Sequence, residues 1–169
     1  SGNSVYFWQN SLWQKFTTLT EITVLKQTSQ YVMRSLQTQS FTASQLTSIN
    51  SDANFEVPIV WLSNEISIDN PSDIELIAGN NNFRIKTSGN YSIVSNFSFN
   101  PQRKVSTDNS NYTYVAFSVL KSINNGSSWT TIAGAATPYD IGVSNQIQTI
   151  IIPRTILHFN AGDLIRIVI

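Results

Sequence analysis

The alternation of apolar and polar positions predicts β-strands through most of the chain after residue 52. In 90–99 every second side chain is apolar, which is typical of a strand with one buried face. In 112–122 both faces carry apolar side chains, which suits a strand that lies between two layers or contacts another subunit. One face of that run carries Val115, Phe117 and Val119, and the opposite face carries Tyr112, Tyr114 and Leu120.

Turn residues separate these runs and predict how they connect. The segment 124–128 contains Asn125-Gly126, a pair that tolerates positive φ, and the run 129–132 follows it, so we expect a hairpin. We expect no helix between residue 52 and the end of the sequence. Short strands spaced by turns predict an all-β sandwich or barrel. Further strands are expected at 57–62, 83–86, 147–152, 155–159 and 164–169.

The first 51 residues differ in pattern and are interpreted as an N-terminal extension, with the β domain at 52–169. Ile22, Leu25, Val32 and Leu36 have heptad-compatible spacing, which would suit a short trimeric stalk. The many threonines in 17–23 favour extended or β structure instead, so both interpretations stay open. The Ser/Thr-rich stretch 35–49 resembles the linkers between shaft and head in trimeric fibre proteins.

Composition and charge exclude several classes of function. The net charge is zero and only 12% of residues are charged, so the chain lacks the basic footprint that nucleic acids require. Ser, Thr, Asn and Gln together make up about 40% of the chain. Such neutral polar surfaces suit extracellular β proteins, sugar-binding faces and viral or phage fibres. No apolar stretch reaches the length of a membrane span, and there is no cysteine for a disulfide or thiolate site.

Groups for catalysis or metal binding are scarce and scattered. His158 is the only histidine, so two-histidine metal sites and Ser-His-Asp triads lack partners. The carboxylates between Asp52 and Glu75 match no known calcium loop and are interpreted as solvated loop acids. The isolated glycines form no phosphate-binding loop. We therefore expect no enzyme activity, no cofactor and no metal.

Aromatic residues beside turns are the candidates for recognition, because exposed aromatic rings stack on sugars and anchor protein contacts. Trp129 and Tyr139 each lie beside a turn, and Asp140 adjoins the second. These three residues are the predicted ligand-binding positions. Trp61, flanked by apolar neighbours, is interpreted as a core residue.

Two short motifs occur in a specific order. The run Phe83-Arg84-Ile85 precedes Gly89-x-Tyr91, where glycine permits a tight turn and tyrosine fills a core face. Later, Ala161-Gly162-Asp163-x-Ile165 makes a reversal before a strand. Over residues 55–169 this order resembles the tumour necrosis factor and complement-q jelly-roll superfamily. The resemblance implies a jelly-roll β-sandwich, with the N-terminal extension outside it.

The resemblance also implies an assembly and a role. Members of that family are homotrimers, so the apolar residues Tyr112, Tyr114 and Leu120 are expected at a subunit interface. We expect a non-enzymatic head or virion protein of a phage or virus, contacting a host-surface glycan or protein. The alternatives are a bacterial cell-surface or spore-coat adhesion jelly roll, or a carbohydrate-binding module. Either way, we expect it on a virion or at an extracellular surface, without membrane insertion.

The family's jelly rolls close with a further strand after the Gly-Asp motif. This sequence ends at Ile169, directly in a predicted strand. Two interpretations follow. The end is truncated, or the closing strand comes from residues 1–50 or from another subunit.

Overall fold

The computed structural model describes residues 6–9, 12–15, 31–52, 54–62, 64–68, 73–77, 79, 81–100, 112–140 and 147–169. The chain divides into two compact units, Ser1–Gln30 and Tyr31–Ile169. In the first unit, β1 (Tyr6–Gln9) and β2 (Leu12–Lys15) form an antiparallel pair in which the backbone of Trp8 lies opposite that of Trp13.

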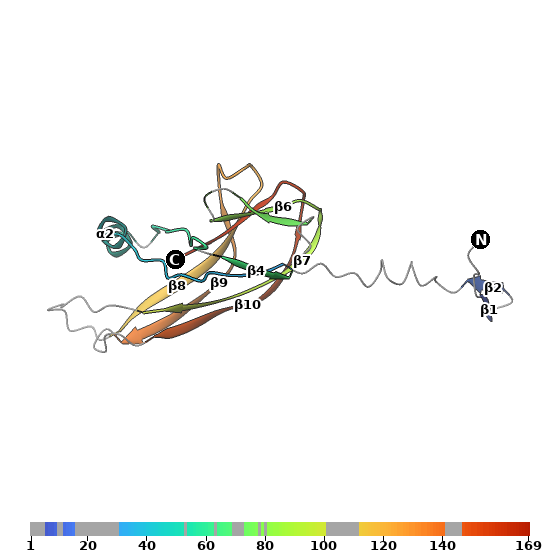
Figure 1. Ribbon diagram of the computed structural model, residues 1–169, viewed down its shortest axis with the longest axis horizontal. Helices are drawn as coiled ribbons and strands as arrows, with labels where there is room; N and C mark the ends of the chain where they lie inside the picture. Colours follow the sequence, from blue (N-terminus) through green and yellow to red (C-terminus); the bar gives the residue numbers. More distant parts are fainter. Residues whose placement is uncertain are drawn as a thin grey trace. The chain divides into compact units, whose positions relative to one another are not determined.

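The second unit is built from antiparallel sheets (Figure 1). A five-stranded sheet has the order β5 (Ile74–Leu76), β6 (Asn82–Ile85), β11 (Leu164–Val168), β8 (Tyr112–Ser122) and β9 (Thr130–Asp140). A two-stranded sheet pairs β7 (Gly89–Phe99) with β10 (Gln148–Phe159). The all-β prediction is confirmed for the described residues, in which one helix accompanies the strands.

The pairing of the last six strands is nested. β8 pairs with β9 as a hairpin, β7 pairs with β10 around it, and β6 pairs with β11 around both. The chain crosses between the two sheets at every link in this series except the β8–β9 hairpin. These nested pairs make one long antiparallel ribbon. The ribbon folds over into a β-sandwich, so that strands from both of its halves lie in the sandwich's two sheets.

The core lies between the two sheets. Phe97 of β7 stacks on Phe117 of β8 with ring centroids 4.7 Å apart and planes 4° apart. Trp61 packs edge-on against Phe83, as its interpretation as a core residue requires. Burying each large apolar side chain contributes about 1.5–3 kcal/mol, so this cluster holds the sheets together. Its buried members are Ile85, Phe117, Val119, Ile150, Ile152, Phe159, Ile165 and Ile167.

Most strand predictions are confirmed, with two differences. β10 runs unbroken through Pro153, because a register shift between Ile152 and Thr155 places the proline at a bulge, where its missing N–H breaks no ladder bond. The segment 57–62 is not a regular strand and makes only an isolated bridge, Pro58 to Val168, with flanking backbone bonds to Ile167 and Ile169. β11 therefore has neighbours along both edges, namely β8 on one side and β6 followed by this segment on the other.

The compact unit begins earlier than the domain start expected at residue 52. β3 (Val32–Arg34) pairs with β4 (Glu65–Ile68), and the Gln39 side chain bonds the backbone of Pro58 and Val60. Helix α2 (Ala43–Ser51) occupies part of the expected linker, begun by a capping box between Thr42 and Gln45. That Thr-x-x-Gln spacing is a helix-start signal readable in the sequence.

The heptad suggested for a stalk is only partly described. Val32 lies in a strand, and Leu36 lies outside any helix. Ile22 and Leu25 fall outside the described residues.

Candidate functional site

The outward side of the β7–β10 sheet is an extended exposed surface. We call it the β7–β10 face. It consists of side chains that alternate with the core-facing ones along each strand. Its members on β7 are Asn90, Ser92, Val94, Asn96 and Ser98, and those on β10 are Thr149, Ile151, Arg154, Ile156 and His158.

The polar residues of this face are ordered in cross-strand pairs. Nδ1 of His158 and Oδ1 of Asn90 lie 3.1 Å apart, and the hydroxyls of Ser98 and Thr149 lie 3.2 Å apart. Both pairs join residues that are directly opposite each other in the β7–β10 register. The side chains therefore present their remaining hydrogen-bonding groups in fixed positions.

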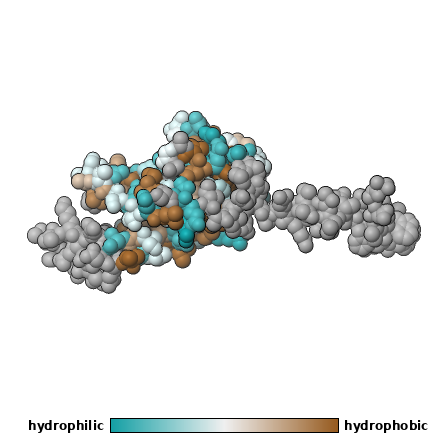
Figure 2. Space-filling model, viewed as in Figure 1, coloured by the Kyte–Doolittle hydropathy of each residue, from teal (hydrophilic) through white to brown (hydrophobic). Residues whose placement is uncertain are grey.

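The apolar residues of the same face lie between these pairs. Val94, Ile151 and Ile156 are 64%, 61% and 63% exposed. Three aliphatic side chains at this exposure on one small sheet form an apolar strip within a polar rim, which is the pattern of a contact surface. Figure 2 shows hydrophobic and hydrophilic residues interspersed over the described part of one side of the molecule.

The bulge in β10 creates half of the β7–β10 face. Before it, odd-numbered Thr149 and Ile151 point outward, whereas after it even-numbered Arg154 and Ile156 do. Because side chains alternate strictly along a regular strand, only the extra residue in the bulge can change this parity. The bulge therefore aims Arg154 at solvent rather than at the core.

The predicted ligand-binding residues do not form one site. Trp129 precedes β9, whereas the backbones of Tyr139 and Asp140 lie at its other end, paired with Thr113 and Tyr112. Eleven strand residues span about 35 Å, so the two ends cannot contact one small ligand. The side chains of Tyr139 and Asp140 lie outside the described residues.

Trp129 is half-buried against its own chain. The guanidinium carbon of Arg166 lies 4.2 Å from the centroid of its ring, and Arg166 also pairs with Glu56 at 3.3 Å. The hairpin loop behind it is fixed by the buried Ser122, whose Oγ accepts the N–H of Gly126 at 2.9 Å. The loop and Trp129 thus cover the outer side of the five-stranded sheet around Leu164 and Arg166.

The residues expected at a subunit interface also do not form one surface, because they differ in exposure. Leu120 is 3% exposed, because other parts of its own chain cover it. Leu120 is therefore not available to another subunit. Tyr114 is 73% exposed, and the side chain of Tyr112 lies outside the described residues. Around Tyr114 the exposed neighbours on β8 and β9 are Ala116, Gly134, Ala136 and Pro138.

The two sequence motifs meet at one end of the sandwich. The N–H of Ala161 donates to Oγ of Ser88, directly before the Gly89-x-Tyr91 motif, at 2.9 Å. The Tyr91 hydroxyl donates to the carbonyl of Thr87, and burial, followed by the negative charge of Asp73, raises its pKa. Gly89 has no positive φ, so the tight turn expected there is not what it provides. It begins β7 instead.

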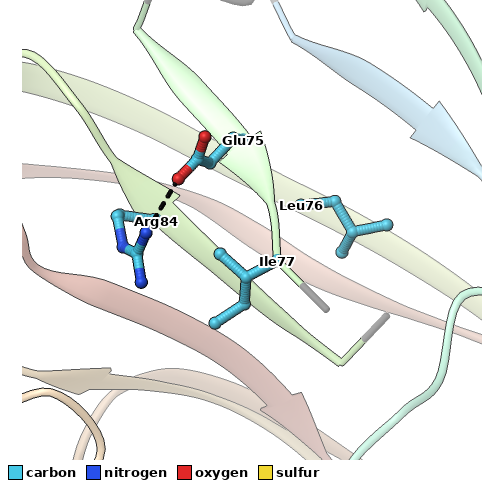
Figure 3. A pocket seen from close by; sticks show the side chains of 4 residues that line it. All are labelled: Glu75, Leu76, Ile77 and Arg84. Carbon is cyan, nitrogen blue, oxygen red and sulfur yellow. Dashed lines mark hydrogen bonds and ion pairs between the residues drawn. The ribbon is translucent and has the colours of Figure 1, made fainter. Parts of the chain in front are cut away.

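A hollow lies at the β5–β6 edge of the five-stranded sheet (Figure 3). It is open and lined by Glu75, Leu76, Ile77 and Arg84, and the Glu75 carboxylate pairs with Arg84 across the strands at 3.0 Å. Because carboxylate and guanidinium neutralise each other, this hollow offers little to a charged ligand. Lys86 lies 3.9 Å from the same carboxylate.

The described residues show neither a metal cluster nor a membrane helix. Within these ranges no three histidine or acidic side chains gather closely enough to hold a metal ion. In the part of the chain that is described, no helix has the length and apolar character needed to cross a bilayer. Compared with protein-family models and with curated proteins, the chain matches none, and the candidate site is defined by its geometry alone.

Proposed function

We propose that this chain is a non-enzymatic binding module whose β7–β10 face contacts a glycan on a cell surface. The observation that carries the proposal is the ordered row of amide, hydroxyl and imidazole groups on that face, alternating with exposed aliphatic side chains. Sugars present hydroxyls and apolar C–H faces side by side. A surface with both kinds of partner, already fixed by cross-strand bonds, loses little conformational entropy on binding.

The proposal includes a jelly-roll fold. Its support is the nested pairing of β6 with β11, β7 with β10, and β8 with β9, because a jelly roll arises when a long antiparallel ribbon folds over into two sheets. Jelly-roll domains serve as capsid and lectin domains. On this basis we place the module in a virion, as a fibre head or surface protein, or on a cell surface.

The proposal also includes a homotrimer. Tyr114 protrudes from a patch of small exposed residues, and such a patch lets another subunit approach closely while the ring inserts into it. Sedimentation equilibrium should give three times the chain mass of 18.9 kDa. Tyr114→Lys should give monomers, whereas Thr131→Lys, an exposed change near the other end of the same sheet, should not. A wild-type chain that sediments as a monomer would refute this assembly.

Glycan binding is tested with the full chain on a glycan array and on whole cells before and after glycosidase treatment. We expect array binding and a loss of cell binding when surface sugars are removed. A paired change, Ile151→Asp with Ile156→Asp, should abolish both signals because it places charge in the apolar strip. Cell binding that survives glycosidase but not protease would point to a protein receptor and contradict the glycan proposal.

A further inference from the structure

We propose that Arg154 anchors a subsite for a carboxylate-bearing sugar on the β7–β10 face. The inference rests on the proposed function and specifies its ligand class. The subsite consists of Arg154, Ser92, Ile156, Asn90 and His158. It is the part of the face that lies beyond the bulge.

Charge complementarity favours an anionic ligand here. Strands β7 and β10 contain Arg154 and His158 but no aspartate or glutamate, although the whole chain is neutral. Four acids of the described region pair with cations elsewhere. Glu75 pairs with Arg84, Glu56 with Arg166, Glu65 with Arg34, and Asp163 with Lys121. The subsite is therefore a local positive area that an anion can neutralise.

The guanidinium of Arg154 is oriented before any ligand arrives. Its Nε donates to Oγ of Ser92 at 2.6 Å, which fixes the plane of the group. Within the described part of the chain, Nη1 and Nη2 have no partner. These two nitrogens form the planar fork that binds both oxygens of a carboxylate at once. We assign the subsite to a carboxylated sugar, and a sulfated sugar, whose oxygens the fork can also bind, is the competing outcome of the test.

The neighbouring residues can hold the rest of the sugar. Ile156 is directly opposite Ser92, to which the guanidinium is bonded, and His158 is directly opposite Asn90, the next outward residue along β7. The contact between His158 and Asn90 uses Nδ1 and Oδ1, which leaves the imidazole Nε2 and the amide Nδ2 for sugar hydroxyls. Exposed Ile156 offers an apolar contact for C–H groups of the ring.

The test compares carboxylated, sulfated and neutral glycans of matched size by calorimetry with the full chain. We expect the carboxylated glycan to bind and its methyl ester to bind at least about tenfold more weakly, because the ester cannot accept the charged bidentate pair. Arg154→Met should weaken binding by a similar factor. Arg154→Lys should not restore it, since lysine lacks the fork. Ser92→Ala should cost about threefold by releasing the guanidinium plane.

Arg34→Met is the matched control, because Arg34 is also exposed on a strand but lies in β3. It should leave affinity within about twofold. Equal binding of neutral and carboxylated glycans, preference for sulfate, or an unaffected Arg154→Met variant would overturn the inference and leave the glycan-binding function standing. No binding to any glycan would overturn the proposed function and this inference together.

Discussion

Asp163 and Lys121 form an ion pair, 2.8 Å between Oδ2 and Nζ, that ties the β10–β11 turn to the end of β8. Asp163 is only 4% exposed, and the same carboxylate oxygen accepts the N–H of Asn160 at 2.8 Å. The Lys121 ammonium also lies 4.6 Å from the Phe159 ring centroid. The geometry of the Gly-Asp turn thus comes from one acid that closes the turn and pairs with a neighbouring strand.

Replacing Asp163 should destabilise the domain strongly. Asp163→Asn keeps the shape of the side chain but leaves the Lys121 charge unpaired beside a buried turn, so the free energy of unfolding should fall by about 2–4 kcal/mol. Urea denaturation followed by tryptophan fluorescence measures this. Glu65→Gln, which breaks the exposed pair with Arg34, is the control and should cost less than about 1 kcal/mol. Equal effects of the two changes would argue against the structural role of Asp163.

The two motif glycines should respond differently to alanine. Gly162 has φ of +96°, a left-handed conformation, so Gly162→Ala should cost about 1–2 kcal/mol although nothing lies within 4 Å of the added Cβ. Gly89→Ala should be neutral within about 0.5 kcal/mol, because its backbone is not left-handed and its nearest contact would be an ordinary 3.8 Å to Tyr91. Thermal unfolding of both variants measures these changes in stability. A larger loss of stability for Gly89→Ala than for Gly162→Ala would contradict the backbone argument.

Trp129 should matter for stability and not for glycan affinity. Trp129→Leu removes the cation–π contact with Arg166 and part of the cover over the sheet, which should cost about 1–2 kcal/mol. Affinity for the glycan should stay within about twofold, since Trp129 does not belong to the β7–β10 face. Denaturation and calorimetry on the same variant separate the two effects. A large loss of affinity at unchanged stability would instead support Trp129 as a ligand residue.

Alkaline pH should destabilise the domain through Tyr91. Burial, followed by the charge of Asp73, raises the pKa of Tyr91 above its ordinary value of 10.0, so the folded chain holds the phenol proton more strongly than the unfolded chain. The resulting stabilisation is complete below the ordinary pKa and is lost as pH rises through the raised folded-state value. Stability measured from pH 8 upward should fall above about pH 10, and Tyr91→Phe should flatten that decline. An identical decline in both proteins would exclude Tyr91 as its cause.

The hydrophobic pattern identifies local structure where one face of a strand is buried. The alternation in 90–99 predicts β7, because the apolar residue types mark the buried face of the strand. The Asn125-Gly126 turn predicts the β8–β9 hairpin, because both residue types tolerate positive φ. The capping box at Thr42 was an equally local signal for α2. In each case a few consecutive residues contain the whole physical cause.

The pattern fails where burial depends on distant residues. Leu120 alternates onto the same face as Tyr114, yet other parts of the chain cover Leu120 and leave Tyr114 exposed. Trp129 lies beside a turn, as an exposed aromatic residue might, but its environment is set by Arg166 on β11. Neither the cover over Leu120 nor the partner of Trp129 can be read from local sequence.

The sequence by itself therefore determined that the chain forms antiparallel strands with a neutral, polar surface, because periodicity, turn residues and composition act locally. Only the tertiary structure decided which strands share a sheet and which exposed side chains lie together. The bulge at Pro153 illustrates the difference. It depends on how β10 aligns with β7, and it alone turns Arg154 outward to stand beside Ser92, some sixty residues earlier in the chain.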